Sequence, residues 1–427
     1  MSAVHPQIAE AALKCQFVED QKRLLPHLQA LRYSSTFPDI FADTSMSVQQ
    51  RREMDEDADA VLWPNAPKNV TWYDRILEMT RQQAEVGEVP LRWVFLMEHY
   101  IRQTMKCLKH GDLKLAIKYM GVYSHVIGDV AEPVHAICPE IIHQVIPTPD
   151  AFVGYDLHSG TENVMAPVDI VGYQPKRLGN TVQKAVMGAY VSLCECRQIG
   201  AAQMVPMAQA TYAGDKESVI RHSSLAQNAA ARAFADFIFT VLRLVDDVNH
   251  EAENQLDLRR YPWAHTHSDM LYGYQPVRDR SPIPYGMGKY EPLVVMDGGM
   301  EKPVQGLSML PRLSPPFTSD RDRSVWVTYW LAPSAYQRFE SRVASNPRFT
   351  DAMFPVRFTV ELDDVPVFVS GDMGVDDSPQ LISVALGNAR WLTLKCNTVG
   401  NPTSEDVKRL SCAWAPHGVW ADPKLIG

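Results

Sequence analysis

The sequence predicts two domains, a helical domain over residues 1–272 and an all-β sandwich over residues 293–427. In the first part, apolar residues recur at three- and four-residue steps, which is typical of amphipathic helices. In the last part, short segments alternate between apolar and polar residues, which is typical of half-buried strands. The chain has 427 residues, more than one hydrophobic core usually spans, so two domains are the expected organisation.

The helical prediction is clearest in residues 91–130 and 225–248. The first segment has the helical apolar period, and the second is long and rich in alanine, the best helix former. His-Gly-Asp at 110–112 predicts a break between two helices. Three prolines between His135 and His158 predict a loop there.

The β prediction begins after a passage rich in Pro, Gly and Tyr at 273–292, which we expect to be the inter-domain linker. Beyond it, short runs rich in β-branched and aromatic residues predict strands. Several short strands separated by turns favour a sandwich. The expected strands lie at 324–332, 354–363, 365–372, 381–386 and 390–396.

Composition excludes some classes of protein. The chain is 46% hydrophobic and 21% charged, as expected of a globular protein. Its net charge of −9 argues against binding duplex nucleic acid by neutralising phosphates. The seven cysteines are irregularly spaced, without a CxxC pair, which favours a reducing compartment. We find no signal peptide and no apolar run of about 18 residues, so we expect a cytoplasmic protein without a membrane span.

Two pairs of metal-ligand residues stand four positions apart, His125 with Asp129 and His158 with Glu162. On a helix this spacing places both side chains of a pair on one face. Imidazole and carboxylate are ligands that hold Zn²⁺. With His135 just after the first pair, the donors suffice for a cluster of more than one metal.

The string H-x3-D-x3-P-x-H followed by H-x3-E resembles the zinc-dependent phospholipase C superfamily, which includes the single-strand-specific zinc nucleases. The resemblance implies an all-α domain that binds two or three Zn²⁺ ions and hydrolyses a phosphodiester. His125 and Asp129 would serve the paired zincs, with Asp129 bridging two metals. His135, His158 and Glu162 would bind the other zinc.

The resemblance also implies ligands near the start of the chain. An early His is expected, and His5 fits the place, with His27 as the competitor. An Asp is expected before the central helices, and Asp39 fits best, with Asp43 behind it. In the family this carboxylate would also serve catalysis, because it can orient the attacking water or accept its proton.

One ligand of the family pattern is absent from this sequence. A His is expected some dozens of residues before His125, but residues 69–79 contain none, and Asp74 or His99 would have to replace it. The first zinc position could therefore be rearranged or lost. A further pair, His265 and His267, would point the same way on a strand. We interpret it as a surface feature rather than a metal site.

The C-terminal part resembles the NPCBM family of carbohydrate-binding modules, which have a jelly-roll fold. The matching segments are 355–371, 382–396 and 417–425, and Trp420 to Pro423 is the most specific piece. The resemblance implies a carbohydrate ligand. The tryptophans fit equally well as core residues, because sequence does not distinguish a buried ring from one that stacks on a sugar.

These patterns favour a zinc-dependent phosphodiesterase acting on a phospholipid or a nucleotide. Phospholipase C is preferred because Glu162 rather than Asp closes the motif and because residues 158–163 resemble the lipase form. The long gap from His135 to His158 favours a nuclease instead. The alternative from another class is a zinc-binding scaffold that no longer catalyses and that presents the sugar-binding module.

Overall fold

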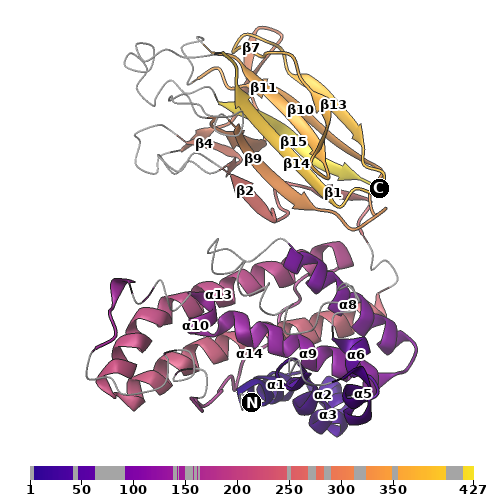
Figure 1. Ribbon diagram of the computed structural model, residues 1–427. Coiled ribbons are helices and arrows are strands. Elements are labelled where there is room, and N and C mark those ends of the chain that lie inside the picture. The colour runs from indigo at the N-terminus through magenta and orange to yellow at the C-terminus, as the bar shows by residue number, and fades with distance from the viewer. Residues whose placement is uncertain are drawn as a thin grey trace. The chain divides into compact units, whose positions relative to one another are not determined.

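The computed structural model describes residues 4–41, 47–62, 92–137, 142, 144–149, 157, 161, 164–247, 252–267, 276–282, 290–311, 324–348, 354–400 and 417–427. The chain divides into two compact units, Met1–His250 and Glu251–Gly427. The first unit is helical and the second is a sandwich of two antiparallel sheets (Figure 1). This confirms the predicted fold class, an all-α domain followed by an all-β sandwich.

The described helices of the first unit are, in chain order, α1 (Val4–Lys14), α2 (Val18–Leu24), a 3₁₀ turn (Leu25–His27), α3 (Leu28–Ser34), α4 (Phe37–Phe41), α5 (Val48–Met54), α6 (Ala58–Val61), α8 (Arg92–Lys109), α9 (Leu113–Ala131), α10 (Pro133–Ala136), α13 (Val182–Ala213) and α14 (Lys216–Asp246). None of these helices combines the length and the apolar character needed to cross a bilayer.

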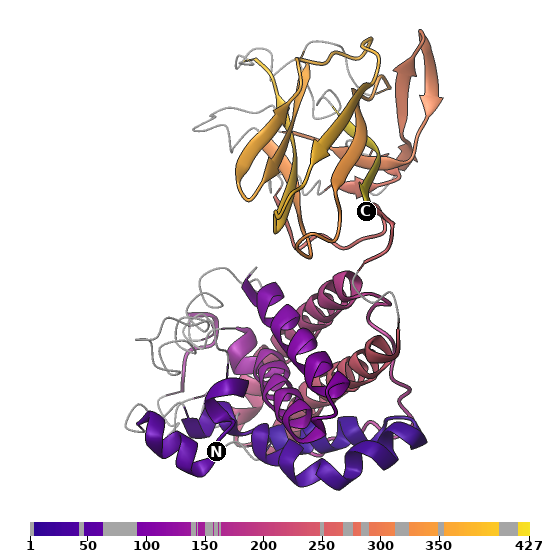
Figure 2. The same ribbon diagram turned by 90° about the vertical axis from the view of Figure 1, so that its right-hand side faces the viewer.

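Helix α9 is the central element of the helical unit and contacts α1, α3, α8, α13 and α14 (Figure 2). It begins after the predicted break, where the Asp112 side chain accepts a hydrogen bond from the backbone N–H of Leu115 and caps the helix. From Ala116 to Ala131 every residue of α9 except Asp129 is buried. The helix that carries the first ligand pair is therefore fixed by packing on all sides.

The long helices α13 and α14 form an antiparallel hairpin beside α9. Helix α13 ends at Gly214, whose φ of +71° is a left-handed conformation that favours glycine. The next residue, Asp215, accepts a hydrogen bond from the N–H of Ser218 and caps α14. A two-residue turn thus reverses the chain and brings both helices against the central one.

The strands of the second unit are β1 (Gln255–Asp257), β2 (His265–His267), β3 (Val277–Arg278), β4 (Arg280–Pro282), β5 (Tyr290–Pro292), β6 (Val294–Asp297), β7 (Met300–Pro303), β8 (Gly306–Met309), β9 (Ser324–Trp330), β10 (Arg338–Ser345), β11 (Val356–Leu362), β12 (Val365–Val369), β13 (Gln380–Ala385), β14 (Trp391–Thr398) and β15 (Gly418–Ile426). One sheet has the order β13-β10-β15-β8-β3, with β1 also paired to β15, and the other has the order β12-β11-β14-β9-β2. The five strands expected between residues 324 and 396 are all present.

The core of the sandwich is formed by the inward-facing side chains of both sheets. Trp420 on β15 is fully buried, and its ring meets Phe358 on β11 edge to face, with the centroids 5.3 Å apart. Trp330 on β9 is also fully buried. These two tryptophans are core residues, which decides between the two interpretations that the sequence left open for them.

The predicted domain boundary is corrected by the strand pairing. We expected residues up to 272 in the helical domain and a linker at 273–292. Instead, β1 pairs with β15 and β2 pairs with β9, so both belong to the sandwich. Strand β3 in the expected linker pairs with β8. The division lies at His250 and Glu251, because segments of two or three residues show too little alternation to be recognised as strands from sequence alone.

This boundary predicts which fragment folds by itself. We expect residues 251–427 to be a cooperatively folded domain, and we expect residues 293–427, which lack β1 to β5, to be markedly less stable. The reason is that removing β1 and β2 exposes the backbone groups of β15 and β9. Circular dichroism and urea unfolding of the two fragments measure the difference, and equal stability would show that the first five strands are dispensable.

His417 connects two segments of the sandwich through a buried hydrogen bond. Its Nδ1 lies 2.7 Å from Oγ of Ser281 on β4, and both residues are fully buried. Burial lowers the pKa of His417 from 6.5 to about 3. Because the folded-state pKa lies below the unfolded one, the unfolded chain binds a proton that the folded chain does not. Stability is therefore lost as the pH falls below 6.5, until about pH 3.

The substitution His417→Asn tests this dependence. Asparagine keeps a hydrogen-bonding group for Ser281 but does not titrate, so the variant should lose less stability than the parent between pH 6.5 and 4.5. The expected difference in slope is about 1.4 kcal/mol per pH unit. Urea unfolding followed by tryptophan fluorescence reports on the sandwich, since six of the nine tryptophans lie in 251–427. Identical slopes in parent and variant would contradict the assignment.

Candidate metal centre

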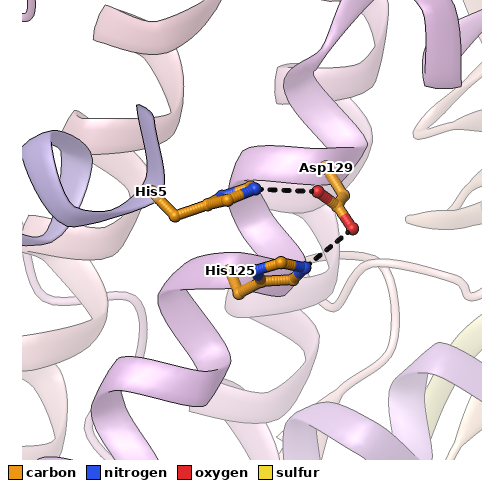
Figure 3. Close-up of side chains that lie close together, drawn as sticks. All are labelled: His5, His125 and Asp129. Atoms are coloured by element: carbon orange, nitrogen blue, oxygen red, sulfur yellow. Dashed lines mark ion pairs between the residues drawn. The ribbon is translucent and has the colours of Figure 1, made fainter. Parts of the chain in front are cut away.

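Two helices bring the central residues of the site together. His125 and Asp129 lie one turn apart on α9, as their spacing predicted, and His5 reaches them from α1 (Figure 3). Oδ1 of Asp129 lies 3.3 Å from Nε2 of His5, and Oδ2 lies 3.2 Å from Nε2 of His125. The carboxylate thus bridges two imidazoles. The rings contact each other, with their centroids 3.9 Å apart.

Two further predicted residues adjoin this group. Oδ1 of Asp39, on the short helix α4, lies 3.6 Å from Nε2 of His125. Nδ1 of His135 lies 4.0 Å from Oδ1 of Asp129. His135 returns to the site because α9 ends at Ala131 and Pro133 starts α10, where proline fits the first helical position. Five of the predicted ligands therefore lie together, with His5, His125 and His135 within 4.0 Å of the Asp129 carboxylate and Asp39 beside His125.

A hydrogen bond that sequence analysis did not identify orients His125. Its Nδ1 lies 2.9 Å from the backbone carbonyl oxygen of Ser35. Because a carbonyl oxygen is an acceptor, Nδ1 donates this hydrogen bond, and the Nε2 edge of the ring faces the carboxylates. Metal-binding histidines commonly have such an outer partner. No sequence signal could have identified Ser35, because every residue carries a carbonyl group.

The charges of the site are strongly coupled. Burial alone would lower the pKa of His125, but Asp129, Asp39 and the Ser35 carbonyl raise it to about 9. Burial and the neighbouring His125 lower the pKa of His5 to about 3. Burial alone would raise the pKa of Asp129, but the adjacent imidazoles hold it well below its usual value. Without a metal, the group therefore contains one imidazolium, one neutral imidazole and a carboxylate.

The site has one buried side and one accessible side. The His5 and His125 side chains are 5% and 3% exposed, whereas Asp129 and Asp39 are each 27% exposed. The imidazole rings are thus held in the core, while the Asp129 and Asp39 side chains are partly exposed, so the centre is accessible from the carboxylate side.

The donor set fits a metal ion. Among the residues that the structure describes, His5, His125 and Asp129 form the one group of three metal-ligand side chains whose donor atoms all lie within 4.8 Å of one another. Both ring nitrogens of His5 are buried and make no hydrogen bond within the described part of the chain. Two imidazole nitrogens and a carboxylate oxygen are donors that suit Zn²⁺.

Several other predicted residues lie outside the part of the chain that the structure describes. His158 and Glu162 lie outside the described residues, as do Asp43, Asp74 and the whole of 69–79. The described neighbour Leu157 packs in an apolar cluster with Val134, the residue before His135. The residue before His158 and the residue before His135 therefore share one cluster of the core.

The competing histidines lie away from the centre. His27 ends the 3₁₀ turn after α2, and it is not part of the described metal-ligand group. His99 on α8 packs against Tyr100 and Tyr119 instead. His267 on β2 stacks on Trp326, with the ring centroids 3.9 Å apart. Of the two candidates for the early ligand, His5 is the one that reaches the site.

Comparison with known proteins assigns the second unit. Residues 321–426 match the family model described as the NPCBM/NEW2 domain, which confirms the resemblance predicted from the sequence. The CBM51 domain of GH95 from Clostridium perfringens, solved in complex with methyl-galactose, is 19% identical over 40% of this chain and 99% of that chain, with a TM-score of 0.30. No protein with a curated description matches the chain.

Two solved structures match nearly the whole chain at low identity. The alpha toxin from Clostridium absonum is 10% identical and covers 98% of this chain and 92% of its own, with a TM-score of 0.34. The alpha-toxin from an avian strain of Clostridium perfringens is 10% identical and covers 95% and 84%, with a TM-score of 0.31. At this level the comparison assigns no activity to the chain.

The bridging position of Asp129 predicts that zinc binding depends on this carboxylate. In Asp129→Asn the negative charge between the two imidazoles is lost. We expect zinc affinity to fall by roughly 100-fold or more, which exceeds the loss usually seen when a residue that only hydrogen-bonds to a metal ligand is replaced. The control is Asp236→Asn, because Asp236 is a buried carboxylate that binds Tyr173 and Lys176 instead. Zinc measured by mass spectrometry after equilibrium dialysis compares the three proteins. Equal zinc content in Asp129→Asn and the parent would contradict the assignment.

Proposed function

We propose that the helical domain is a zinc-dependent phosphodiester hydrolase of the phospholipase C type and that the sandwich binds carbohydrate. The observation that carries the proposal is the carboxylate of Asp129 between two buried imidazoles. Burying three ionisable groups together is costly unless they are paired or bind a metal. A site of this composition, open on its carboxylate side, suits a metal-dependent hydrolase better than a purely structural cluster.

Each residue has a proposed role. His5, His125 and Asp129 hold one zinc, and His135 serves a second together with His158 and Glu162. A bound zinc would make hydroxide available near neutral pH and would withdraw charge from a phosphoryl oxygen. The Ser35 carbonyl keeps Nε2 of His125 directed at the centre.

Asp39 is the proposed proton acceptor. Its carboxylate adjoins His125 at 3.6 Å and is partly exposed, so it can reach both the centre and incoming water. A carboxylate in that position can orient an attacking water molecule and take its proton as the water attacks phosphorus. The P–O bond to the leaving group then breaks on the opposite side of phosphorus, and the departing alkoxide takes a proton from solvent to become the alcohol.

The proposed substrate is a phospholipid headgroup ester. The net charge of −9 disfavours a long polyanion, whose binding relies on many basic contacts. The Glu at position 162 and residues 158–163 support the same choice through the family resemblance. A single-stranded nucleic acid is the second candidate, supported by the long separation of His135 from His158.

A carbohydrate ligand for the sandwich is supported by the match of residues 321–426 to the NPCBM/NEW2 domain. The buried Trp330 and Trp420 cannot stack on a sugar. Trp326 and Trp391 are half-buried, and Trp326 also stacks on His267, so only the exposed part of each ring is proposed to contact a sugar. The sugar contact is therefore proposed for these two residues rather than for the segment that gave the clearest sequence resemblance.

The variant Asp39→Asn separates catalysis from metal binding. Because its proposed role is proton transfer, the variant should keep at least the zinc held by His5, His125 and Asp129. Its hydrolysis of a chromogenic phosphocholine ester should slow by about 100- to 10,000-fold. Asp43→Asn is the matched control, since it makes the same chemical change four residues later in the chain and should leave the rate unaltered.

Three outcomes would revise the proposal. An Asp39→Asn variant as active as the parent would remove Asp39 from catalysis. Cleavage of single-stranded DNA in preference to the phosphocholine ester would favour the nuclease. A parent that binds zinc but hydrolyses neither substrate would favour the zinc-binding scaffold, for which the missing His in 69–79 is the sequence argument.

A further inference from the structure

The imidazole of His5 lies directly against the backbone of α9 at Gly128. A Cβ atom at position 128 would lie 2.6 Å from Nδ1 and 3.0 Å from Cε1 of His5. Cβ atoms in proteins essentially never lie closer than 3.0 Å to another heavy atom of this kind. The ring therefore occupies the space that any side chain at position 128 would need. Gly128 stands three residues after His125 and next to Asp129, on the helix that carries both.

The two imidazoles of the centre are oriented by different means. His125 is held by a hydrogen bond from Nδ1 to the Ser35 carbonyl. His5 has no comparable hydrogen bond among the described residues, and the partner of its Nε2 is the Asp129 carboxylate at 3.3 Å. Its Nδ1 edge faces Gly128 instead, and its Nε2 edge faces Asp129. The close contact with Gly128, rather than a hydrogen bond, determines that Nε2 of His5 faces Asp129.

We propose that Gly128 is a positioning residue for the metal centre and that it acts through His5. The inference rests on the proposed metal site, but the contact itself is independent of any metal. The His5 side chain is 5% exposed and its ring contacts the His125 ring, with the centroids 3.9 Å apart, so the ring has little room to move within the core. A methyl group at position 128 would displace the ring from Nε2 contact with Asp129.

The test uses Gly128→Ala, His5→Ala and the double variant of the full-length chain. Zn²⁺ affinity is measured by competition with a chromophoric chelator, and the melting temperature is measured on the metal-free proteins. In the parent background, Gly128→Ala should weaken Zn²⁺ binding by about 10- to 100-fold, the usual effect of misplacing a ligand through a residue behind it. It should also lower the melting temperature, because the buried ring is displaced.

In the His5→Ala background the same change should have the opposite effect on stability. The next atom near the added Cβ is Cδ1 of Ile8 at 3.4 Å, an ordinary contact. Alanine favours helix over glycine, so the melting temperature should rise. Zn²⁺ affinity, already reduced by the loss of His5, should fall no further. If Gly128 acted independently of His5, the change in melting temperature caused by Gly128→Ala would have the same sign with and without His5.

Each outcome decides the inference. Parent-like Zn²⁺ affinity in Gly128→Ala would overturn it, and so would an equal loss of affinity in both backgrounds. If Gly128→Ala alone does not fold but the double variant does, the contact with His5 is confirmed. If neither folds, the added methyl group clashes elsewhere and the inference fails. If the parent binds no Zn²⁺, the proposed metal site fails, and the reversal in melting temperature still tests the contact.

Discussion

The Asp129 carboxylate lies between two buried imidazoles, and the local structure of the helical domain is arranged around this contact. Two rings and a carboxylate in the core cost free energy unless each polar atom has a partner. The carboxylate provides one to His5 and one to His125. It thereby links α1 to the otherwise buried central helix α9. The same oxygens reach solvent, so a contact that organises the fold also faces incoming ligands.

The part of this centre that follows from helical spacing was predictable from sequence. His125 and Asp129 share a face because they stand one turn apart, and the turn at Pro133 brings His135 back. The placement of His5 and Asp39 rested on family resemblance, since no local pattern connects residues so distant in the chain. Both lie at the centre in the structure. Their roles as metal ligand and proton acceptor remain predictions.

Other determinants of the site could not be read from the sequence. The Ser35 carbonyl orients His125 through a backbone atom that every residue possesses. Gly128 matters through the space it leaves, and a glycine within a helical pattern gives no sign of what occupies that space. In the sandwich, alternation revealed β9 and β11 to β14 but not β10. It revealed neither β1 and β2, of three residues each, nor that Trp420 faces the core.

The central claim is that a zinc ion binds between His5, His125 and Asp129. Anomalous diffraction from crystals of the full-length chain grown with Zn²⁺, recorded on both sides of the zinc absorption edge, tests it most directly. The account predicts an edge-specific peak about 2.0 to 2.2 Å from Nε2 of both histidines and from an oxygen of Asp129. Well-ordered side chains at that position without an edge-specific peak would contradict it.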